Sequence, residues 1–294
     1  MKSKIRQGMA RVATPARTVV LVVLLTMTAY AARADWRVEA ETGLLYESNL
    51  SNSDRASDER DDVAWQSKLR LGNGLQLTRD LRLNLSADAS EQVWAQYDDF
   101  NNLAAGGTAG LRYRFGLGGK APWVLVEDHA AYAFFNGDRR SGLENRFRVR
   151  GGVGISDRLS AEAGYTFDDF EAKESFFDLC GHSGSIRLTF DATESLQVAL
   201  GYSYREGDVI SYARPPRPDV AAVAVEELES IESFGRPLYN AYRLRGSTNA
   251  VSASLGYTLT KNASVLVSYE FRHTASGPLE YENHVVEAKF SFAY

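Results

Sequence analysis

The sequence predicts an all-β protein: a closed antiparallel transmembrane β-barrel of about twelve strands, with one short helix in a long loop. Three observations predict this fold. Apolar and polar residues alternate along many segments of the 294-residue chain, as they do in strands that have one apolar and one polar face. The connections between these segments are short turns and long polar loops in alternation. The chain also holds 15 Tyr, 14 Phe and 4 Trp, enough for the aromatic girdles of a membrane barrel.

Residues 1–34 have the pattern of a secretory signal peptide, so they stand apart from the fold. A basic stretch is followed by the apolar run at 19–28 and by a small-x-small cleavage site, Ala32-Arg33-Ala34, before Asp35. The apolar run is about half of the ~20 residues that a membrane-spanning helix needs. We therefore expect cleavage after Ala34, and a single barrel domain over residues 35–294.

The alternation predicts six strands in the first half of that domain. The first ends in an acidic loop that is too polar to bury, and a tight turn at 78–80 joins the second to the third. The phase of the fifth strand stays open, because Asp128 and its neighbours Glu127 and His129 fall on opposite faces. The six strands span residues 36–45, 63–77, 81–89, about 104–115, 123–134 and 144–155.

Six more strands follow, interrupted by one long segment. They span residues 159–167, 185–190, 196–205, about 243–259, 265–271 and 284–294. The interruption at 206–241 contains Arg214-Pro215-Pro216-Arg217-Pro218, which cannot join a sheet interior.

The long segment 206–241 also predicts the short helix, at residues 219–233, which begins acidic and continues AAVAVEELESIES. We expect this segment to fold into or over the pore and restrict it, because loops of that length are uncommon unless functional. Its acidic side would face basic barrel walls; the alternative is a solvated external loop. The acidic residues are Glu226, Glu227, Glu229 and Glu232.

The last strand carries the clearest signature. Its apolar face ends on aromatic residues: Val286, Ala288, Phe290, Phe292 and Tyr294. This end resembles the closing strand of bacterial outer-membrane β-barrels, which pairs with the first strand and serves as an assembly signal; the usual last residue there is Phe.

The resemblance implies the outer membrane of a Gram-negative bacterium, with lipid and lipopolysaccharide around the barrel and the barrel assembly machinery as a partner. Lipid cannot hydrogen-bond a free sheet edge, so such a sheet must close. A soluble sandwich or a lipocalin-like barrel is the alternative.

Arginines form the strongest chemical pattern. They occupy the polar faces of four predicted strands, and the polar face of a membrane barrel is its lumen, where rows of arginine favour anions. The pattern resembles the oligogalacturonate-specific porins, twelve-stranded barrels that take up acidic sugars through arginine-lined lumens. The likeness covers architecture and lumen character only, with no motif matched residue by residue. The candidate pore-lining residues are Arg112, Arg114, Arg146, Arg148, Arg150, Arg187 and Arg205.

The resemblance implies a passive channel for small solutes, with anionic ones as candidates. Two other interpretations stay open. The arginines can instead pair with carboxylates and merely fill or solvate the lumen; the candidate partners are Glu39, Asp88, Glu144, Glu162 and Glu287.

The second alternative interpretation rests on the stretch at 46–50, YESNL. It resembles the Tyr-Asp-Ser-Asn opening of some proteobacterial outer-membrane barrels, with Glu where Asp is usual. That resemblance implies a non-transporting barrel that assists envelope assembly or the export of exopolysaccharide or surface protein.

An outer-membrane hydrolase is the third and least favoured function, and we expect no enzyme, cofactor or metal. His182 and Ser183 are adjacent, so in a strand they point to opposite faces. His273 and His284 could face each other across a hairpin near two glutamates and hold a metal, although loop histidines are usually solvated. The single cysteine, Cys180, offers no disulfide framework.

The charge of the chain excludes one class of partner. Six of the 33 basic residues and none of the 38 acidic ones lie in the leader, which leaves a formal charge of −11 on the rest. Nucleic-acid binding proteins are typically basic, so we expect no nucleic acid as partner.

Overall fold

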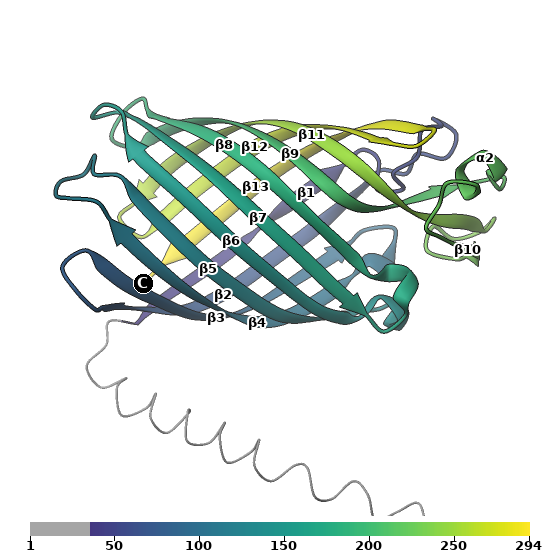
Figure 1. Ribbon diagram of the computed structural model, residues 1–294, viewed down its shortest axis with the longest axis horizontal. Coiled ribbons are helices and arrows are strands. Elements are labelled where there is room, and N and C mark those ends of the chain that lie inside the picture. Colours follow the sequence, from purple (N-terminus) through teal and green to yellow (C-terminus); the bar gives the residue numbers. More distant parts are fainter. Residues whose placement is uncertain (1–35) are drawn as a thin grey trace, which may run out of the picture. The chain divides into compact units, whose positions relative to one another are not determined.

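The protein is described by a computed structural model over residues 36–294, so the predicted leader and its cleavage site lie outside the described residues. Twelve antiparallel strands follow one another around a ring (Figure 1), each paired with its neighbours in sequence order. They are β1 (Arg37–Glu47), β2 (Asp62–Gln76), β3 (Leu81–Trp94), β4 (Asn102–Arg114), β5 (Trp123–Phe135), β6 (Gly142–Gly154), β7 (Leu159–Ala172), β8 (Leu179–Asp191), β9 (Leu196–Ala213), β11 (Tyr239–Thr260), β12 (Ala263–Ser276) and β13 (Leu279–Ala293).

The first and last strands close the ring. β13 pairs with β1 over nine positions, from Glu39 opposite Ala293 to Glu47 opposite Val285. β9 pairs with β11, and a thirteenth strand, β10 (Glu226–Ile231), is attached to β11 outside the ring. The prediction of a closed barrel of about twelve strands is therefore confirmed.

Side chains alternate across the barrel wall. Large apolar residues such as Leu69, Leu111, Phe147 and Leu188 are 39–55% exposed on the outer face, while charged residues such as Glu127 take the alternate positions that face inward. In water such an outer face would be costly, at roughly 25 cal/mol per Å² of apolar surface. The pattern instead fits a lipid-facing belt around a polar lumen.

The pairing settles the open phase of β5. Glu127 lies opposite Gly110 and Arg148, and His129 lies opposite Thr108 and Arg146, all on inward positions. Asp128 therefore faces outward, where it is exposed between the apolar residues of the belt.

The two ends of the barrel differ. At the turn end, short connections join β2 to β3, β4 to β5, β6 to β7, β8 to β9 and β11 to β12. The loop end carries the two longest connections, loop 48–61 between β1 and β2 and the segment 214–238 between β9 and β11. In outer-membrane barrels short turns face the periplasm and long loops face outward.

The segment predicted as irregular from residue 206 is more regular than expected. β9 continues to Ala213 because β11 supplies a backbone partner at each position up to the Asn240–Ala213 pair. The short helix is present but is limited to α2 (Pro218–Ala221), with proline in its first turn. Among the described residues, no helix has the length and apolarity to cross a membrane.

The predicted extent of that helix, residues 219–233, is wrong. Residues 226–231 form β10, which pairs with β11 from Glu226 opposite Arg243 to Ile231 opposite Tyr239. The pattern looked helical locally, but an unpaired strand edge nearby offers these residues hydrogen-bond partners, and strand pairing buries Ile231 in the apolar core.

Candidate functional site

The seven candidate arginines all occupy inward-facing positions. Arg112 and Arg114 lie on β4, three on β6, Arg187 on β8 and Arg205 on β9, in register with other inward residues. The three on β6 are Arg146, Arg148 and Arg150. Their neighbours on these strands at the alternate positions are the exposed apolar residues of the belt.

Carboxylates neutralise the middle of the arginine wall. The Nε of Arg148 lies 3.0 Å from Glu127, and Arg150 lies 3.3 Å from the same carboxylate and 3.5 Å from Glu162. The Arg205 guanidinium lies 2.9 Å from Asp168. Arg146 is paired with Glu144. For these four arginines the pairing interpretation therefore describes the geometry.

Other predicted partners of the arginines pair elsewhere. Asp88 lies 3.5 Å from Lys68, and Glu287 lies 2.7 Å from Lys289. Glu39 lies 3.9 Å from Arg70 of β2. These cations lie on polar strand faces outside the arginine pattern from which the pore-lining residues were predicted. In β2, Lys68 and Arg70 alternate with leucines, and this alternation is the sequence signal that could have identified them.

Three candidate arginines have no ion pair among residues 36–294. Arg187 donates a hydrogen bond to the Ser254 hydroxyl at 3.2 Å. Arg112 stacks on the Trp123 ring, with 4.5 Å between the guanidinium carbon and the ring centroid. Arg114 lies exposed at the turn end of β4.

The opposite side of the lumen is acidic. β1, β12 and β13 place Glu41, Glu47, Glu270 and Glu287 on inward positions, together with Glu39. Arg272 and Lys289 on β12 and β13 and Arg37 on β1 partly balance them: Arg272 lies 2.6 Å from Glu270 and 3.8 Å from Glu47, and Arg37 lies 2.8 Å from Glu39. The lumen thus has a basic wall over β2–β9 and an acidic wall over β12, β13 and β1.

A buried histidine cluster lies on the basic side. His129, with 11% of its side chain exposed, places Nδ1 3.0 Å from the Thr108 hydroxyl and 3.7 Å from Asp88. Asp88 is shared with Lys68. The sequence did not single this cluster out, because its members come from β2, β3, β4 and β5 and meet only through strand register.

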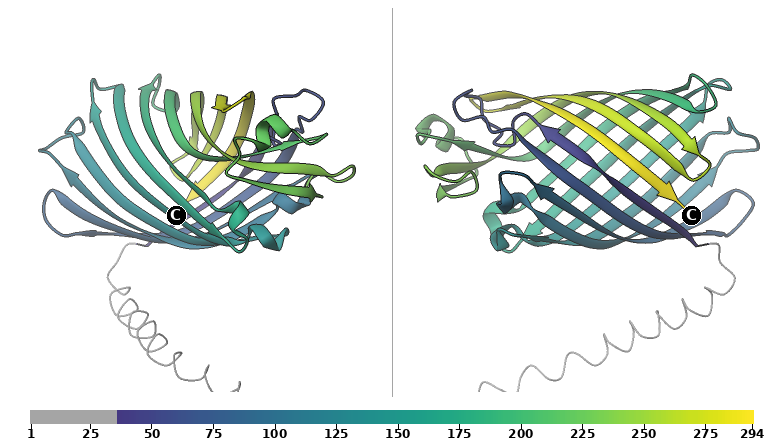
Figure 2. Two further views of the ribbon diagram at one scale, coloured as in Figure 1. Left: turned by 45° about the vertical axis from the view of Figure 1, so that its right-hand side comes forward. Right: turned by 180° about the vertical axis from the view of Figure 1, so that it is seen from behind.

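At the loop end, where loop 48–61, α2 and β10 lie (Figure 2), loops from opposite sides of the ring contribute to one apolar cluster, which we name the cap. Leu50 of loop 48–61 and Phe100, between β3 and β4, pack against the same cluster as Phe176 and Phe177, between β7 and β8. With twelve strands in the ring, the first and last of these connections are half a turn apart. The other buried members are Tyr212, Ile231, Phe234, Tyr239 and Ala241.

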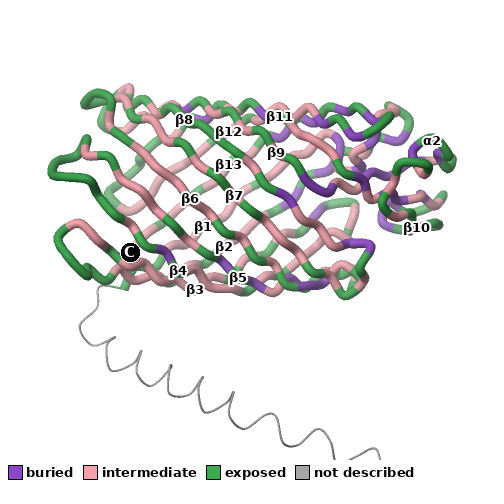
Figure 3. Tube along the Cα trace, viewed as in Figure 1, coloured by how far each residue is buried: buried purple, intermediate pink, exposed green. Residues whose placement is uncertain are grey.

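Buried positions gather at this end of the molecule (Figure 3). Phe234 lies at the centre, with ring centroids 5.0 Å from Tyr97 and from Tyr212 and 5.4 Å from Tyr239. The Arg140 guanidinium lies 4.5 Å from the ring centroids of Phe100 and of Phe177. The cap is therefore a small packed core of its own, to which the 206–241 segment contributes Tyr212, Ile231, Phe234 and Tyr239; that this segment restricts the pore stays a prediction.

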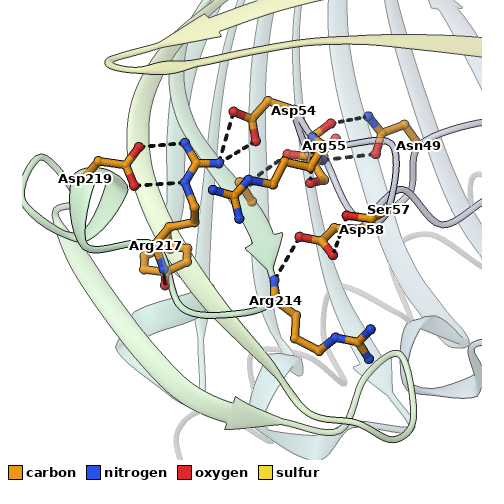
Figure 4. A network of polar contacts seen from close by, with 12 residues as sticks. Asn49, Asp54, Arg55, Ser57, Asp58, Arg214, Arg217 and Asp219 are labelled. Carbon is orange, nitrogen blue, oxygen red and sulfur yellow. Dashed lines mark hydrogen bonds and ion pairs between the residues drawn. The ribbon is translucent and has the colours of Figure 1, made fainter.

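Polar contacts fasten loop 48–61 to the β9–β11 segment (Figure 4). Arg217 donates hydrogen bonds to Asp54 at 2.8 and 3.1 Å and to Asp219 at 2.9 and 2.7 Å. The backbone N–H of Arg214 donates to Asp58 at 3.0 Å. The hydrogen bonds to Asp219, and to a smaller extent those to Asp54, raise the pKa of Arg217 above its ordinary value, so the guanidinium remains charged.

The expected attraction between the loop's acidic residues and the wall arginines is wrong. Glu226 pairs with Arg243 at 2.9 Å, and Glu227 accepts a hydrogen bond from Asn240 at 2.9 Å. Glu232 lies 3.7 Å from Arg236. Since residues 226–231 form a strand on β11, these side chains find partners on β11 or within the segment itself, and none of the three pairs with a candidate wall arginine.

The candidate hydrolase residues do not come together. His182 and Ser183 point to opposite faces of β8. His273 hydrogen-bonds Glu280 at 2.8 Å, while His284 hydrogen-bonds the Tyr269 hydroxyl at 2.8 Å. Within residues 36–294 no group of three His, Cys, Asp or Glu residues is placed to hold a metal ion.

The fold has counterparts among solved structures. No protein-family model and no curated protein sequence matches the chain. The COG4313 outer membrane channel from Pseudomonas putida F1 is similar with a TM-score of 0.60 at 10% identity, over 88% of this chain and 95% of that one. The NanC porin has a TM-score of 0.44 at 11% identity (87% and 98% covered), and the KdgM porin 0.42 at 9% (86% and 99% covered).

At such identities, the likeness to the first structure concerns the fold alone. Together with the closed ring, the apolar outer face and the polar lumen, it makes this chain an outer-membrane β-barrel with a fold similar to that of the COG4313 outer membrane channel.

Proposed function

We propose that the protein is a passive channel for small anionic solutes in the outer membrane. The single observation that supports this most is the surplus of unpaired guanidinium groups on the inward faces of β3, β4 and β8. Arg82, Arg112, Arg114 and Arg187 have no carboxylate within 4.0 Å among the described residues. Guanidinium stays charged at every physiological pH and binds carboxylate or phosphate by donating two parallel hydrogen bonds.

The ion-paired arginines in the middle of the wall contribute little to the proposed anion preference. Because Arg146, Arg148, Arg150 and Arg205 carry ion pairs, they add polar groups but little net positive charge to the lumen. We therefore assign anion preference to the unpaired arginines, and a steric and orienting role to the paired ones. Rings or rows of unpaired basic side chains in a pore favour anions.

Current through single barrels tests the proposal. The purified chain, residues 35–294, is reconstituted in planar bilayers, and the reversal potential is measured across a salt gradient. An anion preference is expected, and Arg187→Gln should reduce it, because it removes an uncompensated charge without leaving a carboxylate unpaired. A cation preference in the wild type, or an unchanged reversal potential in the variant, contradicts the proposal.

A second function is favoured by the cap. A packed apolar cluster across the loop end suits a barrel that does not conduct, and that instead assists envelope assembly or the export of exopolysaccharide or surface protein. The two functions separate in the same bilayers. Absence of current from both the wild type and a chain lacking 214–238 would favour the non-transporting barrel.

A further inference from the structure

We propose that Arg79, Arg82, Arg112 and Arg114 form a binding site at the turn end of the lumen for a small polyvalent anion with carboxylate or phosphate groups. The inference rests on the proposed channel only in so far as solutes reach this end. A passive channel needs no specific binding site, so the location of this site and its class of ligand go beyond the proposed channel function.

Strand register brings these residues together. Gln76 of β2 lies opposite Arg82 of β3, and Arg82 lies opposite Arg112 of β4, all on inward positions. Arg114 is the next inward residue of β4, and Arg79 lies in the turn between β2 and β3. These five residues and Asp80 line a pocket of about 180 Å³, enough for one or two anionic groups.

The charges in this pocket lack compensation. Two arginines directly opposite each other in a sheet repel, and like charges so placed are destabilising. None of the four arginines has a carboxylate oxygen within 4.0 Å among the described residues, whereas those on β6 do. Asp80 is the only acid in the lining. The Nε of Arg112 is buried and has no hydrogen-bond partner.

A bound anion supplies what the pocket lacks. Each carboxylate or phosphate accepts two parallel hydrogen bonds from one guanidinium, and such charge-assisted bonds are about twice as strong as neutral ones. An anion that binds between Arg82 and Arg112 would be attracted to both guanidinium groups and would offset the repulsion between them.

Two of the guanidinium groups have identifiable contacts in the wall. Arg112 stacks on Trp123 at 4.5 Å, which restricts its rotamer. The Arg82 guanidinium lies directly over Gly74 of β2, in space that a Cβ at that position would occupy. Side chains already ordered before binding lose less entropy when they bind, so the stacked Arg112 is preorganised toward the pocket, and the absence of a side chain at Gly74 leaves room for Arg82.

The pocket opens on the lumen side, so its ligand is a solute. The outer face of the same strands carries Leu83, Leu111 and Tyr113, at positions that alternate with the arginines. A lipid headgroup in the surrounding membrane therefore lies on the other side of the wall. Purified protein in a detergent free of phospholipid removes that second source of phosphate from the experiment.

Titration calorimetry in detergent tests the site. The probes are citrate, as a tricarboxylate, and inorganic phosphate, each at low salt so that screening does not hide the interaction. One citrate is expected to bind per chain. The double variant Arg82→Gln/Arg112→Gln should weaken citrate binding about 100-fold, because two charge-assisted interactions are lost and each 1.4 kcal/mol is tenfold.

Arg158→Gln is the matched control. Arg158 is an exposed arginine in the turn between β6 and β7, at the same end but outside the pocket. It makes the same charge change, so citrate binding should stay within twofold of the wild type. Heat-modifiable gel migration reports whether each variant folds; if the double variant does not, Arg114→Gln at the exposed strand end replaces it, with a loss of about tenfold expected.

The outcomes separate the site from the channel. No citrate or phosphate binding by the wild type, or an equal loss in Arg158→Gln and the pocket variant, overturns the site. Binding by a chain that passes no current keeps the site and overturns the proposed channel. An anion-selective current without citrate binding supports the proposed channel and overturns the site.

Discussion

Replacing Arg217 by glutamine should loosen the cap. The side chain of Arg217 is 8% exposed and joins Asp54 of loop 48–61 to Asp219 of α2. Its backbone N–H also donates to the Tyr242 hydroxyl at 2.8 Å, and glutamine preserves that bond. The substitution therefore removes the charged clamp between two loops and leaves the backbone path intact.

The magnitude follows from the burial of the Arg217–Asp54 pair. Breaking a fully buried ion pair by removing one partner costs about 3–5 kcal/mol, because the other charge stays buried and unpaired. Asp54 is 18% exposed, so water relieves part of that cost, and we take about 2 kcal/mol. Since each 1.4 kcal/mol is tenfold, the ratio of open to closed cap should rise about 30-fold.

Single-channel recording measures the open probability directly, and Arg236→Gln is the control. Arg236 lies in the same segment, but it is 86% exposed and its Glu232 partner is 3.7 Å away. Exposed pairs contribute about 0–1 kcal/mol, so this variant should behave as the wild type. Equal open probabilities in the two variants, with equal amide exchange across residues 50–58, would refute the clamp.

Further predictions follow from the cap, the belt and the leader. Hydrogen bonding to its guanidinium partner lowers the pKa of Asp219 to about 2 from an ordinary 3.8. This carboxylate therefore stabilises the cap above about pH 4 and stops doing so as the pH falls through 2. Open probability should rise over that window, and a flat pH profile would contradict this. Deleting 214–238 should raise conductance several-fold with selectivity unchanged, since its acids pair within the cap; a shift in reversal potential would contradict this. Phe290→Asp, on the lipid-facing side of β13, should impair assembly by about 1–3 kcal/mol, whereas Ser291→Asp faces the lumen and should be mild; heat-modifiable gel migration distinguishes them, and equal behaviour would contradict the strand phase. Mass spectrometry of the membrane-extracted chain should show cleavage after Ala34, and an intact leader would contradict the predicted signal.

Strand phase was predictable because it is local. The side-chain period of two assigns Arg112, Arg148 and Arg187 to the polar face from the sequence alone, and the register places each of them on the lumen side. The closing strand was equally predictable from its alternating pattern, and it pairs with β1 in the structure. Only β5 was ambiguous, because Asp128 puts a charge on the outer face and breaks the alternation.

Partners across strands were not predictable, because they depend on register. Arg112 and Arg150 look alike in sequence, yet Arg150 lies between Glu127 and Glu162 while Arg112 faces Arg82. A shift of two residues between β4 and β5 would place Arg112 opposite Glu127 instead of Leu125. The same reasoning explains residues 226–231: their local pattern favoured a helix, but the edge of β11 decided the outcome.

We expect the two ends of the lumen to act independently of each other. Ion-paired arginines on β6 and β9 lie between the cap and the basic pocket, and paired charges transmit little net field along the pore axis. Loosening the cap through Arg217 should therefore change how often the barrel opens and not which ion it prefers. Removing Arg82 and Arg112 should change ion preference and anion affinity but not the open probability. If either substitution moved both quantities, the paired arginines would have to couple the two ends, and the division of the lumen into a gate and a selective site would be wrong.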